Sequence, residues 1–428
     1  MQIHVVQPGE SVYTIARRYQ VSPESIAQVN ELEGQPHLVV GQALVIPVVG
    51  QIYTVRPGKS LYTIGRRFGV PAAELARVNQ IPLEAPIQAG LRLYIPPGAR
   101  RRAEINAYVE PTGDGYSEAA LADVRRALPQ LTYLAPFSFR VRRDGTLQAP
   151  ALDDLRRLAE SADVTPMMVV TNIEGDRFSS ELGRIILNDQ EVQTRLLDNI
   201  LQTARRLGFH DIHFDLEFLR PEDREAYNRF LRRAADRIHG EGLMISTALA
   251  PKTSAAQRGA WYEAHDYRAH GQIVDFVVPM TYEWGYSGGP PMAVSPIGPV
   301  RQVLEYAVSE IPPGKILMGQ NLYGYDWRLP YVRGGEFARA LSPQAAIRLA
   351  AQRNVAIEYD TTAQAPYFDY VDEQGRNHRV WFEDARSIQA KIDLVKELGL
   401  RGISYWRLGL PFPQNWQQIE ANFDVAKR

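Results

Sequence analysis

From residue 103 onward, short runs of apolar residues alternate with longer stretches in which apolar residues recur every three or four positions. The short runs predict buried strands, and the longer stretches predict amphipathic helices. Eight strands joined by helical crossovers predict an α/β fold, a parallel (β/α)8 barrel over residues 103–428. The predicted strands are residues 104–109, 131–136, 165–171, 211–217, 243–250, 274–280, 315–323 and 401–406.

The regular spacing breaks once, between the seventh and the eighth predicted strand. A helical pattern over residues 342–352 and three alternating runs fill this interval. The segment Asp372-Glu-Gln-Gly375 is typical of a tight turn between two of those runs. We therefore expect a small α+β insertion after the seventh strand, at about residues 328–384. It would form one wall of a cleft at the mouth of the TIM barrel.

The first hundred residues hold two copies of one pattern at a constant offset, which indicates a duplication. Each copy predicts a short strand, a Pro-Gly turn, a Ser that caps a helix, a second helix and a last strand. This is a βααβ unit, small for an independent core. The matching segments are VQPGES at 6–11 and VRPGKS at 55–60, VN at 29–30 and 78–79, and IP at 46–47 and 95–96.

Both copies resemble the LysM module in the strand–PG opening, the VN at the end of the second helix and the closing IP. The resemblance implies two modules, residues 1–48 and 51–97, that bind N-acetylglucosamine-containing glycans such as peptidoglycan or chitin. Each Pro-Gly, Ser or Asn taken singly is a turn or cap residue, because a whole surface groove would bind the sugar. Residues 98–102, GARRR, read as a solvated linker.

Composition narrows the function further. With 48 basic and 49 acidic side chains, the net charge of −1 gives no field that favours nucleic acid. The chain has no cysteine, which excludes disulfides, thiolate nucleophiles and Cys-ligated zinc. The N-terminus MQIHVVQPGES lacks the basic and apolar regions of a signal peptide, so we expect none. No apolar run reaches the ~18 residues of a membrane helix, so we expect no membrane insertion.

The densest ionisable cluster, HDIHFDLE at residues 210–217, falls on the fourth predicted strand. Because side chains alternate along a strand, Asp211, His213, Asp215 and Glu217 share one face. Burying three carboxylates inside a barrel is costly, and Glu217 stands at the carboxyl end, where barrel enzymes carry their active sites. The alternative is a structural ion network at the barrel centre.

This cluster resembles the glycoside hydrolase family 18 signature, Asp-x-x-Asp-x-Asp-x-Glu, with Glu217 at its terminal acid and Asp215 two residues earlier. The chain departs from the signature at its middle Asp, where His213 stands, and at its first, where His210 stands. We expect His213 to hold Asp215 by a hydrogen bond and, if protonated, to lower its pKa.

Other strand ends resemble the same family. The segment from Met280 to Glu283 resembles its Met-x-Tyr-Asp element, with Glu283 for Asp. Trp406 ends the eighth strand, where the family places a Trp under the catalytic sugar. Taken alone, a residue such as Tyr282 or Trp406 is more often part of the core than of a site. Gln320 and Asn321 close the seventh strand, and we expect them to face the cleft as substrate-binding residues together with Trp406, Glu283 and His213.

The resemblance implies a retaining, substrate-assisted mechanism. Glu217 would protonate the glycosidic oxygen and later act as base toward water. The 2-acetamido carbonyl of the substrate would attack the anomeric carbon, while Asp215 and Tyr282 orient that group and stabilise the oxazolinium charge. Trp406 would form the floor of the sugar subsite. No cofactor and no metal are expected.

The whole chain resembles the spore cortex-lytic N-acetylglucosaminidases of endospore-forming bacteria. That resemblance implies a peptidoglycan hydrolase made in the mother-cell cytoplasm and deposited in the spore coat or cortex region; we expect it to be a monomer. Two alternatives stay open: a chitinase with LysM anchors, and a lectin on an inactive barrel. Retention of Glu217, Asp215 and Tyr282 argues against the lectin.

Overall fold

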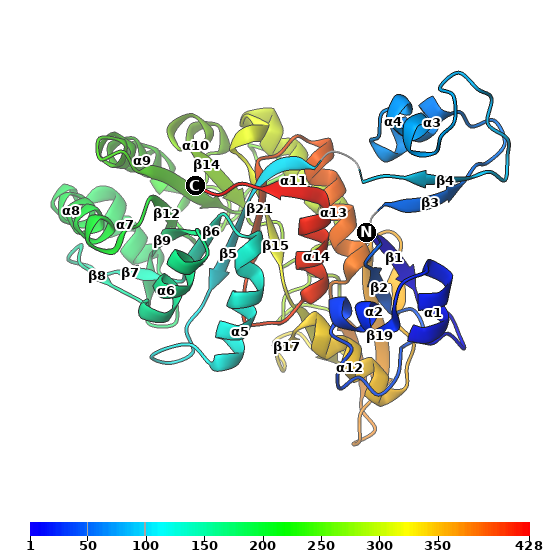
Figure 1. Cartoon of the computed structure of the whole chain (residues 1–428). Helices are drawn as coiled ribbons and strands as arrows, with labels where there is room; N and C mark the ends of the chain where they lie inside the picture. Colours follow the sequence, from blue (N-terminus) through cyan, green and yellow to red (C-terminus); the bar gives the residue numbers. More distant parts are fainter. Residues whose placement is uncertain (49, 98–99) are drawn as a thin grey trace.

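A computed structural model of the protein describes residues 1–48, 50–97 and 100–428. It consists of a barrel and two small N-terminal modules (Figure 1). Residues 98 and 99 of the predicted linker 98–102 lie outside the described residues. None of the helices in the described ranges is long and apolar enough to cross a membrane.

The barrel is a path of eight parallel strands, and each one overlaps a predicted strand. A bridge between Val277 and Ile316 brings the two end strands together and nearly closes the barrel. The predicted TIM barrel is therefore confirmed. In spatial order the strands are β14 (Phe276–Pro279), β13 (Met244–Leu249), β12 (Asp211–Asp215), β9 (Thr165–Thr171), β6 (Tyr133–Pro136), β5 (Arg101–Val109), β21 (Gly402–Trp406) and β15 (Leu317–Asn321).

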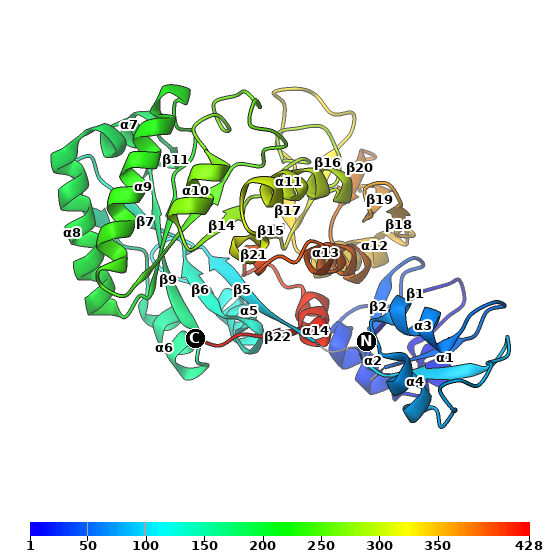
Figure 2. The same cartoon turned by 90° about the horizontal axis from the view of Figure 1, so that it is seen from above.

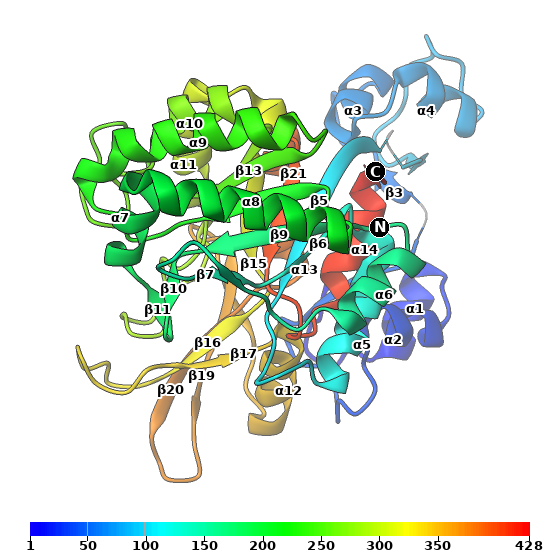
Figure 3. The same cartoon turned by 90° about the vertical axis from the view of Figure 1, so that its left-hand side faces the viewer.

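Helices cover the outside of the barrel, several of them stacked side by side on one flank (Figure 3). Six of them overlap segments in which the pattern predicts a helix, whereas α7, α10 and α14 were not predicted. The helices are α5 (Glu118–Ala127), α6 (Asp153–Ser161), α7 (Ser180–Asn188), α8 (Gln190–Leu207), α9 (Arg224–His239), α10 (Tyr267–Ile273), α11 (Ile297–Glu310), α13 (Ala385–Glu397) and α14 (Pro413–Asn422).

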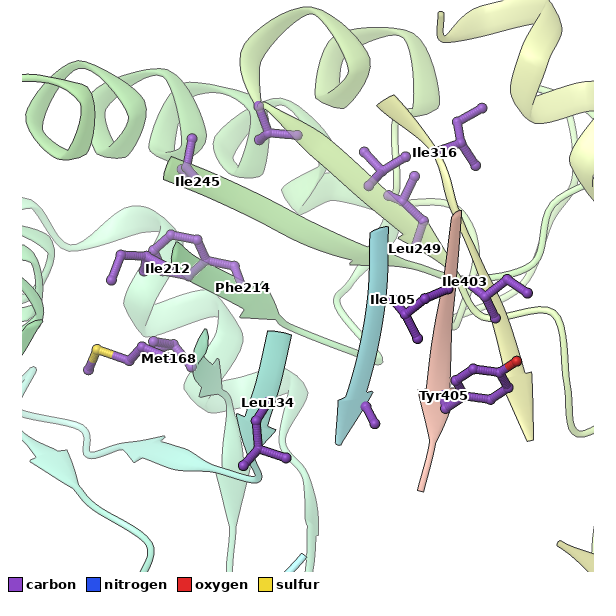
Figure 4. Close-up of a cluster of buried hydrophobic side chains, with 14 of the residues drawn as sticks. Ile105, Leu134, Met168, Ile212, Phe214, Ile245, Leu249, Ile316, Ile403 and Tyr405 are labelled. Atoms are coloured by element: carbon purple, nitrogen blue, oxygen red, sulfur yellow. The ribbon is translucent and has the colours of Figure 1, made fainter. Parts of the chain in front are cut away.

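Apolar side chains fill two shells. Outward-facing strand residues pack against the helices in one large cluster, part of which Figure 4 draws. Inward-facing residues such as Tyr133, Met167 and Phe276 form a second cluster inside the barrel. Strand β12 follows this alternation, because Ile212 and Phe214 belong to the outer shell. Its ionisable residues therefore point inward.

The insertion after β15 is a five-stranded antiparallel sheet with one helix, α12 (Pro343–Arg353), as the pattern predicts. Its first strand begins at Gly324, ahead of the expected boundary near residue 328, because the chain reverses directly after β15. The strands, in spatial order, are β17 (Arg339–Leu341), β16 (Gly324–Arg328), β20 (Asn377–Trp381), β19 (Ala365–Val371) and β18 (Glu358–Asp360).

Each N-terminal module is a βααβ unit with its own apolar core. In both, the motif Ser caps the first helix in a capping box, and the Asn of VN bonds the last strand. Module 1 contains β1 (Gln2–Val5), α1 (Val12–Tyr19), α2 (Pro23–Asn30) and β2 (Ala43–Ile46). Module 2 contains β3 (Gln51–Thr54), α3 (Leu61–Phe68), α4 (Ala72–Val78) and β4 (Arg92–Ile95).

The two modules sit differently on the barrel. Module 1 packs against α13, α14 and the insertion helix α12 (Figure 2). Gln414 on α14 donates to Asn30 Oδ1 at 2.9 Å and to the Ala43 carbonyl at 2.8 Å. Module 2 stands apart from the barrel helices (Figure 1). In the part of the chain that the structure describes, the side-chain bonds of α3 and α4 stay within residues 50–97.

Candidate active site

A cleft of about 470 Å³ opens at the carboxyl ends of the barrel strands. Parallel barrels concentrate functional residues at this end, because all strand ends and their loops meet there. Five predicted site residues line it: Glu217, Asp215, Tyr282, Glu283 and Trp406. Loops and the insertion add further walls, including Arg177 and Phe178 from a short hairpin, β10 (Ile173–Glu174) and β11 (Arg177–Phe178), which carried no recognisable strand pattern.

The backbone of Glu217 is held in place from the neighbouring strand end. Asn172 accepts a hydrogen bond from the Glu217 amide at 3.0 Å and donates one to its carbonyl at 2.9 Å. The preceding carbonyl, of Leu216, contacts His265 Nε2 at 3.0 Å. These bonds fix where the carboxyl group enters the cleft, as a catalytic group requires.

Burial raises the pKa of the Glu217 carboxyl well above its ordinary value, and the charge of Asp215 raises it further. A hydrogen bond of 2.5 Å from Trp261 Nε1 to Glu217 Oε2 acts the other way, because it favours the charged form. Burial dominates, so Glu217 holds a proton at a pH where an exposed glutamate would be ionised. A protonated carboxyl in a cleft can act as a general acid.

Trp261 is a site residue that the sequence did not reveal. It comes from the loop after β13, which has no periodic pattern. Its ring stacks on Phe218, with centroids 6.0 Å apart and planes 11° apart. Phe218 has a left-handed backbone, with φ of 52°, and is 46% exposed. Trp261 itself lines the cleft, where its ring offers an apolar face beside Glu217.

Asp215 and Tyr282 present polar atoms in the same cleft. Burial raises the pKa of the Asp215 carboxyl, and its Oδ1 has no hydrogen-bond partner among the described residues. Burial also raises the pKa of Tyr282, so its phenol stays protonated and can donate. A buried acceptor without a partner is costly unless a ligand satisfies it. The pair is therefore suited to binding a polar substituent of a substrate.

Glu283 and Trp406 complete the cleft. The hydroxyls of Tyr323 and Tyr325 both donate to Glu283 Oε1, which holds that carboxylate at the wall. Trp406 packs edge-on against Phe137, with ring centroids 4.7 Å apart, and lies 5.5 Å from the ring of Tyr108. These contacts fix the indole at the carboxyl end of β21.

His213 corrects one expectation. Its Nε2 lies 2.9 Å from the Tyr108 hydroxyl and its Nδ1 lies 2.9 Å from Ser246 Oγ, so both ring nitrogens are occupied without Asp215. Burial lowers the His213 pKa to about 3, which keeps the ring neutral. His213 therefore supplies no positive charge to Asp215, and it lies beneath the cleft rather than in its lining.

Gln320 and Asn321 do not line the cleft either. Gln320 pairs in register with Tyr405, which packs in the outer shell, so its side chain points away from the barrel interior. Asn321 accepts from Ser295 Oγ at 2.6 Å and donates to the Tyr323 carbonyl at 2.7 Å. Both amides brace the loop that follows β15. The two residues had been expected in the cleft only because they stand at the end of a strand.

Comparison with known proteins agrees with this geometry. Residues 107–410 match the model of glycosyl hydrolases family 18, and residues 4–47 and 53–96 match the LysM domain. The chain is 64% identical to the cortical fragment-lytic enzyme of Bacillus subtilis over 428 residues, covering 100% of this chain and 99% of the relative.

Solved structures give the same result. The crystal structure of the Bacillus megaterium spore cortex-lytic enzyme SleL superposes with a TM-score of 0.91 at 55% identity, covering 100% of this chain and 99% of that one. A chitinase structure from Chromobacterium violaceum, 24% identical with a TM-score of 0.68, shares the fold over 75% of this chain and 98% of that one. The chain thus belongs to family 18 of the glycosyl hydrolases, as a glycoside hydrolase with two N-terminal LysM domains.

Proposed function

We propose that this enzyme cleaves β-linked N-acetylglucosamine bonds in the peptidoglycan of the spore cortex. The full-length relatives are a cortical fragment-lytic enzyme and spore cortex-lytic enzymes, which supports the cortex as substrate. Within the site, the observation that carries the proposal is the pairing of a protonated Glu217 with an Asp215 oxygen that lacks a partner among the described residues.

The mechanism follows from these two carboxyl groups. Glu217 donates its proton to the glycosidic oxygen while the carbonyl of the substrate's own 2-acetamido group attacks the anomeric carbon. Asp215 accepts from the acetamido N–H, and the Tyr282 hydroxyl donates to its carbonyl oxygen. Asp215 then stabilises the positive oxazolinium ring. Glu217, now a carboxylate, takes a proton from the water that opens this ring, so the configuration at the anomeric carbon is retained.

The division of labour along the chain is part of the proposal. Residues 1–48 and 51–97 anchor the enzyme to polymer, residues 98–102 link them to the barrel, and residues 103–428 catalyse. Anchoring raises the effective concentration of the catalytic domain on insoluble substrate. The enzyme acts as a monomer, made in the mother cell and deposited in the coat or cortex region. No nucleic acid and no metal take part.

The variant Glu217→Gln tests the assignment. We expect hydrolysis of purified cortex peptidoglycan to fall by about 10²–10⁴-fold, the usual contribution of general acid–base catalysis, while polymer binding is kept. With the wild-type enzyme, mass spectrometry of the products should show N-acetylglucosamine at the new reducing ends.

Glu110→Gln is the matched control. Glu110 lines the same cleft, but its side chain is 41% exposed and its ion pair with Arg407 at 3.1 Å is open to solvent, so replacing it should change activity little. Wild-type cleavage of chitin in preference to cortex would favour the chitinase alternative. Binding without cleavage of either polymer would indicate a lectin.

A further inference from the structure

A second cavity, of about 800 Å³, lies on the insertion and is larger than the catalytic cleft. It runs between the sheet and the face of α12 that carries Ala345, Arg348 and Gln352. Ala340 and Leu410 line both cavities, so the two lie next to each other. Its volume is within the range of ligand sites, about 300–1,000 Å³. We refer to it as the insertion groove.

The acids of the insertion groove are already paired. Asp326 accepts from the Tyr370 hydroxyl at 2.8 Å and is bridged by Arg339 at 3.0 Å and His378 at 2.8 Å. Asp372 is bridged by Arg376 at 2.5 Å. The third acid, Glu336, lies 3.6 Å from Arg328. These carboxylates therefore add little free negative charge to the groove.

Of two arginines that α12 contributes to the groove, Arg348 has no partner among the described residues and Arg353 has only weak ones. Arg348 forms no hydrogen bond or ion pair with any of the described residues. Arg353 donates a long hydrogen bond of 3.5 Å to Glu373, lies 5.6 Å from the centroid of the Tyr370 ring, and has a buried Nε without an acceptor in the described part of the chain. Arg348 and Arg353 both project from α12 into the same groove. The guanidinium fork matches a carboxylate in two parallel hydrogen bonds, so the unpaired Arg348 is suited to an anionic ligand.

We propose that the insertion groove binds the carboxylate-bearing peptide side chains of the glycan strand whose sugars occupy the catalytic cleft. The inference rests on the proposed function, because peptidoglycan carries such peptides and chitin carries none. Because the two cavities share Ala340 and Leu410, they are close enough for one glycan strand to reach both. Arg348 would thereby make the enzyme discriminate between peptide-bearing and bare glycan.

The test compares two soluble substrates: peptidoglycan oligosaccharides that carry peptides, and the same material after an amidase has removed them. We expect Arg348→Glu to lower the ratio of kcat/KM for the peptide-bearing substrate to kcat/KM for the peptide-free substrate about tenfold. This is the effect of losing a charge-assisted hydrogen bond. Arg348→Lys should recover part of this loss. Arg229→Glu, an exposed arginine of α9 outside both cavities, is the matched control and should leave the ratio unchanged.

A binding measurement with free peptides tests the insertion groove independently of cleavage. We expect the peptides released by the amidase to bind Glu217→Gln protein by calorimetry and to bind the Glu217→Gln, Arg348→Glu protein at least about tenfold more weakly. Equal binding to both proteins, or a loss of activity equal on both substrates, would overturn the groove assignment. Wild-type protein that binds the peptides but cleaves neither substrate would overturn the proposed function and leave the groove standing.

Discussion

The protonation state of Glu217 depends on opposing effects around one carboxyl group. Burial and the neighbouring Asp215 favour the neutral acid, whereas the Trp261 N–H favours the carboxylate. A general acid that must later act as base needs both forms within reach, and Trp261 supplies a fixed partner for the charged one. This role depends on the indole N–H and not on the ring alone.

Trp261→Phe separates these two contributions. Removing the N–H takes away a bond that stabilises the carboxylate, so the Glu217 pKa rises and the basic limb of the pH–rate profile moves to higher pH. We expect kcat/KM at the optimum to fall roughly tenfold. Phe218→Leu removes the stacked ring but keeps the N–H, and its profile should not move. A basic limb unchanged in Trp261→Phe would remove Trp261 from the acid–base machinery.

His213 acts on the cleft through Tyr108. Because its ring is neutral, we expect His213→Asn to lower kcat/KM roughly tenfold without moving either limb of the pH–rate profile. Tyr108→Phe deletes the same hydrogen bond from the other side. The double variant should therefore lose little more than either single one, as measured in a double-mutant cycle. Additive losses would mean that the two residues act independently.

At the scale of helices and strands, regular periodicity made the barrel predictable. The barrel strands are largely buried, and the outward residues of β12 follow the period of two that is visible in its sequence. The N-terminal repeat was equally predictable, because the same residues recur at the same spacing. Asn30 and Asn79, for example, make equivalent bonds to the last strand of each module. Such signals are local, so a single sequence carries them.

The elements that escaped prediction depend on tertiary contacts. The hairpin of β10 and β11 has two residues in each strand, too few for a pattern. Glu217 and Asp215 stand near the end of a strand, which marks the mouth of a barrel, whereas Tyr282 and Trp406 were identified through the resemblance to family 18. Trp261 and Asn172 reach the site from loops of ordinary composition, and Gln320 was misplaced because its register with Tyr405 is visible only in the sheet.

At the scale of the whole molecule, the two modules are similar in sequence but differ in how they contact the catalytic domain. Gly41, with φ of +84°, packs so closely on the Ile357 carbonyl that a Cβ would lie 1.8 Å from its oxygen. At its counterpart Gly90, with a similar φ of +90°, a Cβ would meet no described atom within 4 Å. Gln344 adds bonds to the carbonyls of Asn30 and Glu31 at 2.7 and 3.0 Å. Module 1 is thus fixed to the catalytic domain, and module 2 is the freer anchor.

Two truncations test this asymmetry. Removing residues 1–48 exposes the surface of α12, α13 and α14, so we expect the melting temperature to fall by roughly 5 °C or more. Removing residues 1–97 should lower the melting temperature no further, because module 2 adds little to the stability of the barrel.

Both variants should turn over a short soluble oligosaccharide. On insoluble cortex, the variant that lacks residues 1–48 should keep part of the activity through module 2. The variant that lacks residues 1–97 should lose this activity. Equal activity of the two truncations on insoluble cortex would show that module 2 does not anchor the enzyme.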